Sequence, residues 1–223
     1  QVHGVVSAPM NKEAFHQAGF RFADQLPNQA DHTRTPPPYM FGLANGVWTV
    51  AVAEHIAFAD IPKLIKKENV LARIRWMHGA LQQAGLDRPH LAVSALNAHA
   101  GEGGLLGREE IDEIGPAIQQ ARAEGIDAHG PFPADTIFPR ALAREFDGVV
   151  FMHHDQANIA RKLQPREKGG TIFMGLPVPC GTTAHGTAFD IAGKGIADPG
   201  SLEMALEHTA RLAARLADEN AKG

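Results

Sequence analysis

Short apolar runs alternate with longer segments of helical periodicity along most of the chain. Five runs have the length of β-strands, at residues 2–7, 47–53, 91–96, 148–152 and 171–174. They are rich in Val, Ile and Phe and lack strict alternation, which is typical of strands covered on both faces. The alternation of strands with helical segments predicts an α/β fold with a largely parallel sheet.

The helical segments carry recognisable boundaries. Residues 61–85 predict one helix, with Asp60 as its cap, Pro62 in its first turn, Gly85 at its end and an inward face of Leu64, Leu71, Ile74, Met77 and Leu81. Residues 108–125 repeat this design with Ile111, Ile114 and Ile118 inward, and residues 201–221 predict a final amphipathic helix. The Pro-rich segment 26–42 is aperiodic, so a loop is expected there.

Composition excludes several classes of function. The 223 residues are 44% hydrophobic and 21% charged, as in globular domains. A net charge of −4 offers no basic footprint for nucleic acid, and no apolar run is long enough to span a membrane. Cys180 is the only cysteine, so a reducing cytoplasm is expected. The first residues already read as a strand, so we expect that an upstream segment is missing.

Three histidines follow three of the predicted strands. His55 comes after 47–53, His99 after 91–96 and His154 after 148–152. Ligands of open α/β sheets bind beyond the carboxyl ends of the strands, so these imidazoles can converge on one divalent cation. Asp135 and Asp155 can orient them or bind a substrate hydroxyl.

The residues leave alternatives to this metal site open. With 12 histidines in the chain, some fall at strand ends by chance, and His153 competes with its neighbour His154. The remaining candidates in helical or loop contexts are interpreted as surface residues: His16, His78, His90, His129 and His208.

The glycine-rich stretch "AGEGG" after His99 forms either a tight strand-to-helix turn or a backbone anion site. It lacks the third glycine of the dinucleotide fingerprint. Glu109 and Glu110 are interpreted as acids of the following helix's first turn. A second glycine-rich stretch, "HGTAFDIAGKGIADPGS", is either a loop entering the last helix or a site where Asp190 holds a ribose hydroxyl and His185 meets an adenine.

Five motifs in order carry a family resemblance: "LNAHAGEGGLLGREEIDEIGPAI", "GPFPADTIF", "HHDQANIARKL", "GLPV" and "HGTAFDIAGKGIAD". Together, from about Val5 to the end, the chain resembles the 4-hydroxythreonine-4-phosphate dehydrogenase family of vitamin B6 biosynthesis. The resemblance implies an isocitrate/isopropylmalate dehydrogenase-like two-domain α/β fold with mostly parallel sheets. It also implies a homodimer that shares the metal site at its interface.

The resemblance assigns roles to individual residues. His55, His99 and His154 match the family's ligands for a divalent metal (Zn, Mg, Mn or Co). Lys162 matches a substrate-binding lysine that can also relay a proton beside Asp135 and Asp155, and His32 and Thr33 match a substrate-binding pair. The loop of His185, Gly186, Thr187, Ala188, Asp190 and Asp198 resembles the adenosine-binding loop of isopropylmalate dehydrogenases, which implies NAD.

Two departures put the substrate in question. Thr171 and Cys180 stand where the family has a substrate-binding asparagine and arginine. Losing the arginine removes a bidentate anion clamp that cysteine does not reproduce. Dehydrogenases of four-carbon sugar-acid phosphates, or of aromatic cis-dihydrodiol carboxylates, are therefore rivals.

The resemblance also predicts the domain boundaries. Residues 1–25 and 178–223 are expected to be a remnant of the NAD-binding domain, whose N-terminal part is missing, and residues 26–177 the metal-binding and dimerisation domain. The expected reaction is NAD- and metal-dependent oxidation, with β-decarboxylation, of a 3-hydroxy acid such as 4-phosphohydroxy-L-threonine. The alternative of another class is a non-catalytic binding protein. A metal-dependent hydrolase without NAD leaves the loop at His185 unexplained.

Overall fold

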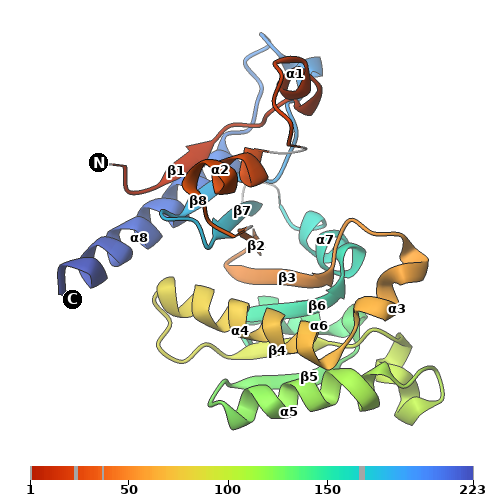
Figure 1. Ribbon diagram of the computed structural model, residues 1–223. Coiled ribbons are helices and arrows are strands. Elements are labelled where there is room, and N and C mark those ends of the chain that lie inside the picture. Colours follow the sequence, from red (N-terminus) through yellow and green to blue (C-terminus); the bar gives the residue numbers. More distant parts are fainter. Residues whose placement is uncertain (1, 23–24, 37, 166–168, 223) are drawn as a thin grey trace. The chain divides into compact units, whose positions relative to one another are not determined.

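The computed structural model describes residues 2–22, 25–36, 38–165 and 169–222 (Figure 1). The chain divides into two compact units, one of residues 1–43 and 164–223 (unit 1) and one of residues 44–163 (unit 2). Among the described residues, no helix is both long and apolar enough to cross a bilayer.

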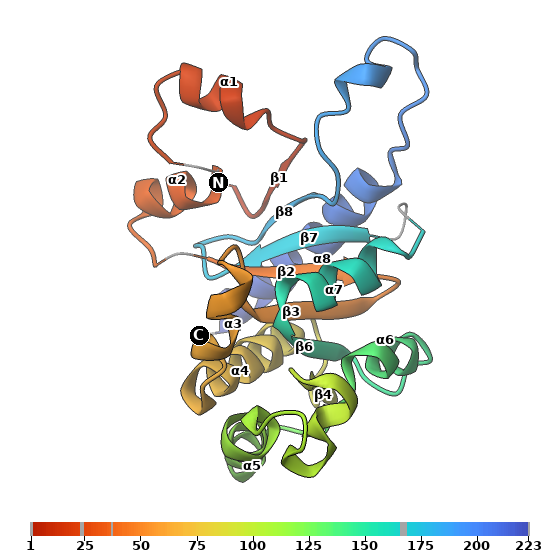
Figure 2. The same ribbon diagram turned by 90° about the vertical axis from the view of Figure 1, so that its right-hand side faces the viewer.

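Unit 2 is a four-stranded parallel sheet in the order β3-β6-β4-β5. The strands are β3 (Val47–Ala53), β4 (Leu91–Ser94), β5 (Ala128–Phe132) and β6 (Gly148–His153). Helices α4 (Lys67–Gln83) and α5 (Gly115–Ala123) cover one face, and α6 (Ala134–Leu142) and α7 (His154–Lys162) cover the other (Figure 2). All seven residues of β3 are buried, as predicted for a strand covered on both faces.

Shorter elements connect these strands and helices. A turn η1 (Phe58–Asp60) leads into the single-turn α3 (Ile61–Leu64). The segment η2 (Ala98–Gly104) follows β4, and a π-turn η3 (Glu110–Ile114) leads into α5.

The strands of unit 1 lie in the order β1-β8-β7-β2. These are β1 (Val5–Ser7), β2 (Tyr39–Ala44), β7 (Gly169–Met174) and β8 (Cys180–Thr183), with β1 and β8 parallel and β7 and β8 antiparallel. The predicted final helix, α8 (Gly200–Lys222), packs against β7 and β8. The other helical elements are α1 (Lys12–Gln17), α2 (Gln25–Thr33) and the turn η5 (Phe189–Ile191). The predicted α/β class with mostly parallel strands is confirmed.

The single helix predicted for residues 61–85 is wrong, because the structure breaks it after α3. Ile65 is fully buried and Lys66 is extended. The carboxylate of Glu113 accepts hydrogen bonds from the backbone N–H of Lys67 (2.8 Å) and from Lys66 Nζ (2.9 Å), so a distant residue satisfies the start of α4. Asp60 stands at the N-cap position of α3, but its side chain makes no capping hydrogen bond and pairs with Lys63 at 2.6 Å. The predicted Pro62 and Gly85 boundaries are confirmed.

Three further local predictions are corrected. Residues 25–33 form α2 and residues 39–44 form β2 instead of a loop, because one proline lies in the first turn of α2 and the others follow the helix end; Pro37 lies outside the described residues. Ile111 is 45% exposed, since the π-turn rotates it outward while Ile114 and Ile118 are buried. His16 is exposed, but His78, His90, His129 and His208 are half-buried, and His129 lies in β5.

Candidate metal and nucleotide sites

The carboxyl ends of β3 and β6 bring two of the predicted metal ligands together. The strands are parallel neighbours with Ala53 opposite His153, so the residues that follow them share one edge of the sheet. The rings of His55 and His154 have centroids 5.3 Å apart. His153 instead packs edge-on against Phe58, at 6.0 Å, and burial lowers its pKa. Of the two neighbouring histidines, His154 is therefore the one that meets His55.

Carboxylates orient two of the predicted ligands. Asp155 Oδ1 lies 2.8 Å from His154 Nδ1, and Glu102 Oε1 lies 2.7 Å from His99 Nδ1. The hydrogen bond from His154 lowers the pKa of Asp155. Because an ionised carboxylate only accepts, each Nδ1 carries the proton, and a neutral ring then presents Nε2 as a lone pair. Metal-binding histidines are usually held in this way, so both rings fit a cation.

The backbone at these strand ends is strained. His55 and His99 have φ of 50° and 52°, and Ala100 and Glu102 are also left-handed. Such conformations cost about 1–3 kcal/mol each for residues other than glycine and cluster at functional sites. Two of the three predicted ligands therefore sit in backbone that the surrounding structure must hold in place.

Glu110 holds the loop that carries His99. Its side chain is 4% exposed, and Oε1 accepts the backbone N–H groups of Leu96 and Asn97, both at 2.8 Å. Oε2 accepts Asn97 Nδ2 at 2.9 Å, and that amide also donates to Glu109 at 2.7 Å. Both acids therefore bind the loop as well as beginning a helix, which the sequence interpretation missed.

Two glycines of the loop make room for those contacts, Gly101 within "AGEGG" and Gly107 just after it. A Cβ on Gly101 would lie 2.7 Å from Glu110 Oε2, and Gly107, with φ of 140°, has no space for one beside the Asn97 amide. Of the two readings of "AGEGG", the tight turn is the one that these contacts explain.

The third predicted ligand does not join the pair within one copy of the chain. Among the described residues, the ligand atoms of one trio of histidine and carboxylate side chains lie within 4.8 Å of one another, and this trio is His90, Asp127 and His129. His55, His99 and His154 do not form such a group.

Two charged residues beside the histidine pair were missed by sequence reasoning. Glu54 is half-buried, and burial raises the pKa of its carboxyl against the opposing charges of His55, Arg73, His154 and Arg161. Burial also lowers the pKa of Arg161, against the charge of Glu54. A titratable group with a shifted pKa next to candidate ligands is typical of functional sites. The available signal was a glutamate directly after a strand that is apolar except for Thr49.

The other predicted catalytic residues of unit 2 lie at helix ends. Asp135 is exposed in the first turn of α6, and Lys162 is exposed in the last turn of α7. Lys162 lies on the same helix as Asp155, at its other end, and its charge adds to the effect of His154 in lowering the pKa of Asp155.

The predicted substrate residues of unit 1 are dispersed. His32 and Thr33 are exposed in the last turn of α2, where Thr33 Oγ1 donates to the carbonyl of Gln29 at 2.8 Å. Thr171 and Cys180 are 7% and 5% exposed in β7 and β8. Burial raises the pKa of the Cys180 thiol. Their substrate roles stay predictions.

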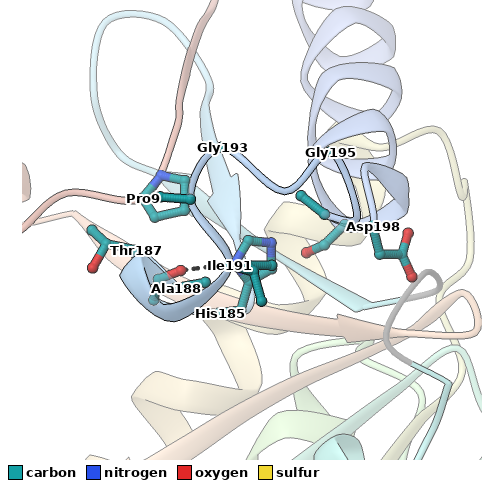
Figure 3. A pocket seen from close by; sticks show the side chains of 12 residues that line it. Pro9, His185, Thr187, Ala188, Ile191, Gly193, Gly195 and Asp198 are labelled. Atoms are coloured by element: carbon teal, nitrogen blue, oxygen red, sulfur yellow. Dashed lines mark hydrogen bonds between the residues drawn. The ribbon is translucent and has the colours of Figure 1, made fainter.

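Unit 1 contains a cavity of about 600 Å³ along the second glycine-rich stretch (Figure 3). It is lined by Pro9, Ser201 and residues of the stretch that include His185, Gly186, Thr187, Ala188, Gly193, Gly195 and Asp198. His185 Nδ1 donates to the carbonyl of Gly186 at 2.9 Å, so a neutral ring offers Nε2 as an acceptor. Asp198 also accepts the backbone N–H of Gly200 at 2.9 Å, at the start of α8. Five of the six predicted cofactor residues thus line one cavity, whereas Asp190 is exposed and not among its lining residues.

The fold and these sites define a class of protein. Parallel strands deliver imidazoles to their carboxyl edge, and a glycine-rich loop borders a cavity before a helix, as in the α/β proteins that bind ligands at strand ends. Comparison with known proteins then gives the family. Residues 1–209 match pyridoxal phosphate biosynthetic protein PdxA, and the chain belongs to this family. The resemblance inferred from the five motifs is confirmed.

Relatives and solved structures agree. The chain is 43% identical over 211 residues to a 4-hydroxythreonine-4-phosphate dehydrogenase of Beijerinckia indica, covering 95% of this chain and 63% of the relative. It is 43% identical over 218 residues to a D-threonate 4-phosphate dehydrogenase of Cupriavidus necator, covering 97% and 66%. The crystal structure of 4-hydroxythreonine-4-phosphate dehydrogenase from Klebsiella pneumoniae matches with a TM-score of 0.80 at 34% identity, over 94% of this chain and 64% of that one. The chain thus spans slightly less than two thirds of these relatives.

Proposed function

We propose that this protein is an NAD-dependent, divalent-metal-dependent dehydrogenase that oxidises a 3-hydroxy acid phosphate, with loss of CO2. The expected substrate is 4-phosphohydroxy-L-threonine or a close analogue. The observation that carries the proposal is the His55–His154 pair at the ends of β3 and β6, in a chain whose relatives are dehydrogenases. A cytoplasmic location is part of the proposal, supported by the single cysteine.

In this proposal His55 and His154 hold the cation together with His99 of a second copy of the chain. One copy does not bring the three rings together, so a homodimer that completes the site agrees with the geometry. Asp155 and Glu102 keep the rings of His154 and His99 in the ligating tautomer. When bound, a divalent cation supplies a Lewis acid for the substrate's oxygen atoms.

The chain's own residues bind the substrate and handle protons. Lys162, on the same helix as Asp155, binds a carboxylate or phosphate of the substrate and can return a proton to the product. Asp135 and Asp155 position the ligands. Glu54 adds a half-buried carboxyl that can accept the hydroxyl proton, since its raised pKa brings it closer to neutral pH.

The cavity of unit 1 is the proposed adenosine end of the NAD site. His185 offers an acceptor to an exocyclic amine, and Gly186, Thr187, Ala188 and Asp198 border the same space. The proposal keeps Asp190 for the ribose. When bound, NAD supplies the hydride acceptor that oxidation of an alcohol requires.

A four-carbon sugar-acid phosphate is the second candidate substrate. A D-threonate 4-phosphate dehydrogenase matches this chain as well as a 4-hydroxythreonine-4-phosphate dehydrogenase does. Cys180 and Thr171 are buried and uncharged, so neither supplies the anion clamp that the family's arginine implies.

The test is NADH formation by the 223-residue chain with 4-phosphohydroxythreonine, D-threonate 4-phosphate and an aromatic cis-dihydrodiol carboxylate, each with and without chelator. A full-length relative serves as the positive control. Chelator-sensitive activity with the first substrate supports the proposal, and activity with another substrate alone transfers it to that class. His154→Ala should lower activity at least ~100-fold, whereas His16→Ala should leave it unchanged.

NAD titration separates the remaining alternative. Saturable binding that weakens about tenfold in His185→Ala supports the cofactor site, since a lost hydrogen bond contributes about 1 kcal/mol or more. No saturable NAD binding together with no activity on any substrate would overturn the proposal and favour a non-catalytic binding protein.

A further inference from the structure

A second group of potential ligands lies at the opposite edge of the unit 2 sheet. His90 directly precedes β4, Asp127 directly precedes β5, and His129 is the second residue of β5. The parallel pairing of these strands sets Leu91 opposite Ala128 and Ala92 opposite His129, which brings the three side chains to the amino ends of the strands. The His55–His154 pair lies beyond the carboxyl ends, about 20 Å away along a strand of six or seven residues.

The three side chains are in direct contact. Asp127 Oδ2 lies 2.6 Å from His90 Nδ1, and Asp127 Oδ1 lies 2.6 Å from His129 Nε2. The two imidazole centroids are 4.7 Å apart. One carboxylate thus bridges two rings, and each partner uses a different oxygen.

The surroundings hold this arrangement and leave it open to solvent. The ring of His90 stacks on Phe146 with centroids 4.7 Å apart, and its backbone N–H donates to Asp147 at 2.8 Å. The side chains of His90, Asp127 and His129 are 39%, 53% and 34% exposed, so a cation can enter from solvent.

The charges at the trio favour a cation. The hydrogen bond from His90, and after it the one from His129, hold the pKa of the Asp127 carboxyl below its usual range, so it is ionised at neutral pH. Arg140 is a nearby opposing charge, over Phe146 at 5.4 Å, and it is paired with Glu145 at 2.7 Å.

We propose that His90, Asp127 and His129 form a second divalent-cation site, separate from the site of the proposed function, for Zn²⁺ or a similar transition metal. Two imidazoles and one carboxylate are a three-ligand set that leaves a coordination position open. Ligand atoms around tetrahedral Zn²⁺ lie about 3.3 Å apart, so each contact opens by less than ~1 Å as the cation replaces the shared ring protons.

The test measures Zn²⁺ binding by equilibrium dialysis in a His55→Ala/His154→Ala background, which removes the pair at the other edge. One saturable equivalent per chain should remain. Adding His129→Gln or Asp127→Asn should weaken it at least ~100-fold, more than the loss of a supporting residue would cause. Asp87→Asn, an exposed acid in the loop that leads to His90, is the matched control and should change nothing.

A spectroscopic readout identifies the ligands independently of affinity. With Cu²⁺ in the same background, the EPR spectrum should show coupling to two imidazole nitrogens, reduced to one by His129→Gln. Circular dichroism checks that each variant is folded. If a histidine variant does not fold, Asp127→Asn, which preserves side-chain shape, is used in its place. Absence of a saturable equivalent in the background, or an equivalent that survives both substitutions, would refute the site.

Discussion

Replacing Glu110 tests how the strained loop after β4 is held in place. In Glu110→Ala the backbone N–H groups of Leu96 and Asn97 lose their carboxylate acceptor, whereas the Asn97 amide keeps Glu109. Leaving a buried donor unsatisfied costs about 1–3 kcal/mol, so two such donors predict a loss of about 3 kcal/mol in the free energy of unfolding. For a chain of this size that corresponds to a fall in Tm of about 6–12 °C.

Glu110→Gln distinguishes the loss of the hydrogen-bond acceptor from the loss of side-chain volume. Both backbone donors use Oε1, so the glutamine carbonyl can still accept them, and only the contact between its NH2 group and Asn97 Nδ2 becomes unfavourable. The expected loss is about 1 kcal/mol, one third of that of the alanine variant.

The assay is urea unfolding followed by circular dichroism, with free energies extrapolated to water. Glu207→Ala, which removes only an exposed ion pair with Arg211, is the control and should change stability by less than about 0.5 kcal/mol. Equal losses in Glu110→Gln and Glu110→Ala, or losses no larger than that of the control, would show that this carboxylate does not hold the loop.

Two further predictions concern the pKa of Glu124 and the reactivity of the Cys180 thiol. Hydrogen bonds from Arg75 lower the pKa of Glu124 to about 2. Because the pKa is lower in the folded state, this exposed pair stabilises the fold above the ordinary glutamate pKa of about 4.3, and the stabilisation is lost as the pH falls toward about 2. In Arg75→Ala, NMR titration should place the Glu124 pKa at least about one unit higher, and an unchanged value would contradict the assigned cause. The Cys180 thiol, buried and with a raised pKa, should react with a disulfide reagent at least ~100-fold more slowly in the folded protein than in urea, and comparable rates would contradict its burial.

The local pattern of apolar residues was sufficient to predict those elements whose formation depends on residues close together in sequence. The apolar runs predicted β3, β4 and β6, because a strand that is buried on both faces reads as a continuous apolar segment. Helical periodicity predicted the last helix, because only one of its faces is buried. Placing His55 and His154 at one edge followed from parallel strands alone. The meeting of their rings needed the structure, since spacing cannot distinguish His153 from His154.

Contacts between residues far apart in sequence decided the rest. Glu113 breaks the expected 61–85 helix from a position 46 residues beyond Lys67, and Asp127 joins His90 across 37 residues. Glu110 similarly binds the backbone of Leu96, 14 residues earlier, in the loop after β4.

By itself, therefore, the sequence of this protein determined five of its strands, β1, β3, β4, β6 and β7, its family and the set of chemically active residues near strand ends. Only the tertiary structure decided which of those residues touch, which carboxylate orients which imidazole, and that a second His–Asp–His group exists. The reason is physical. Periodicity records which face of an element is buried, whereas the partner on that face is set by strand order and register, which no local pattern contains.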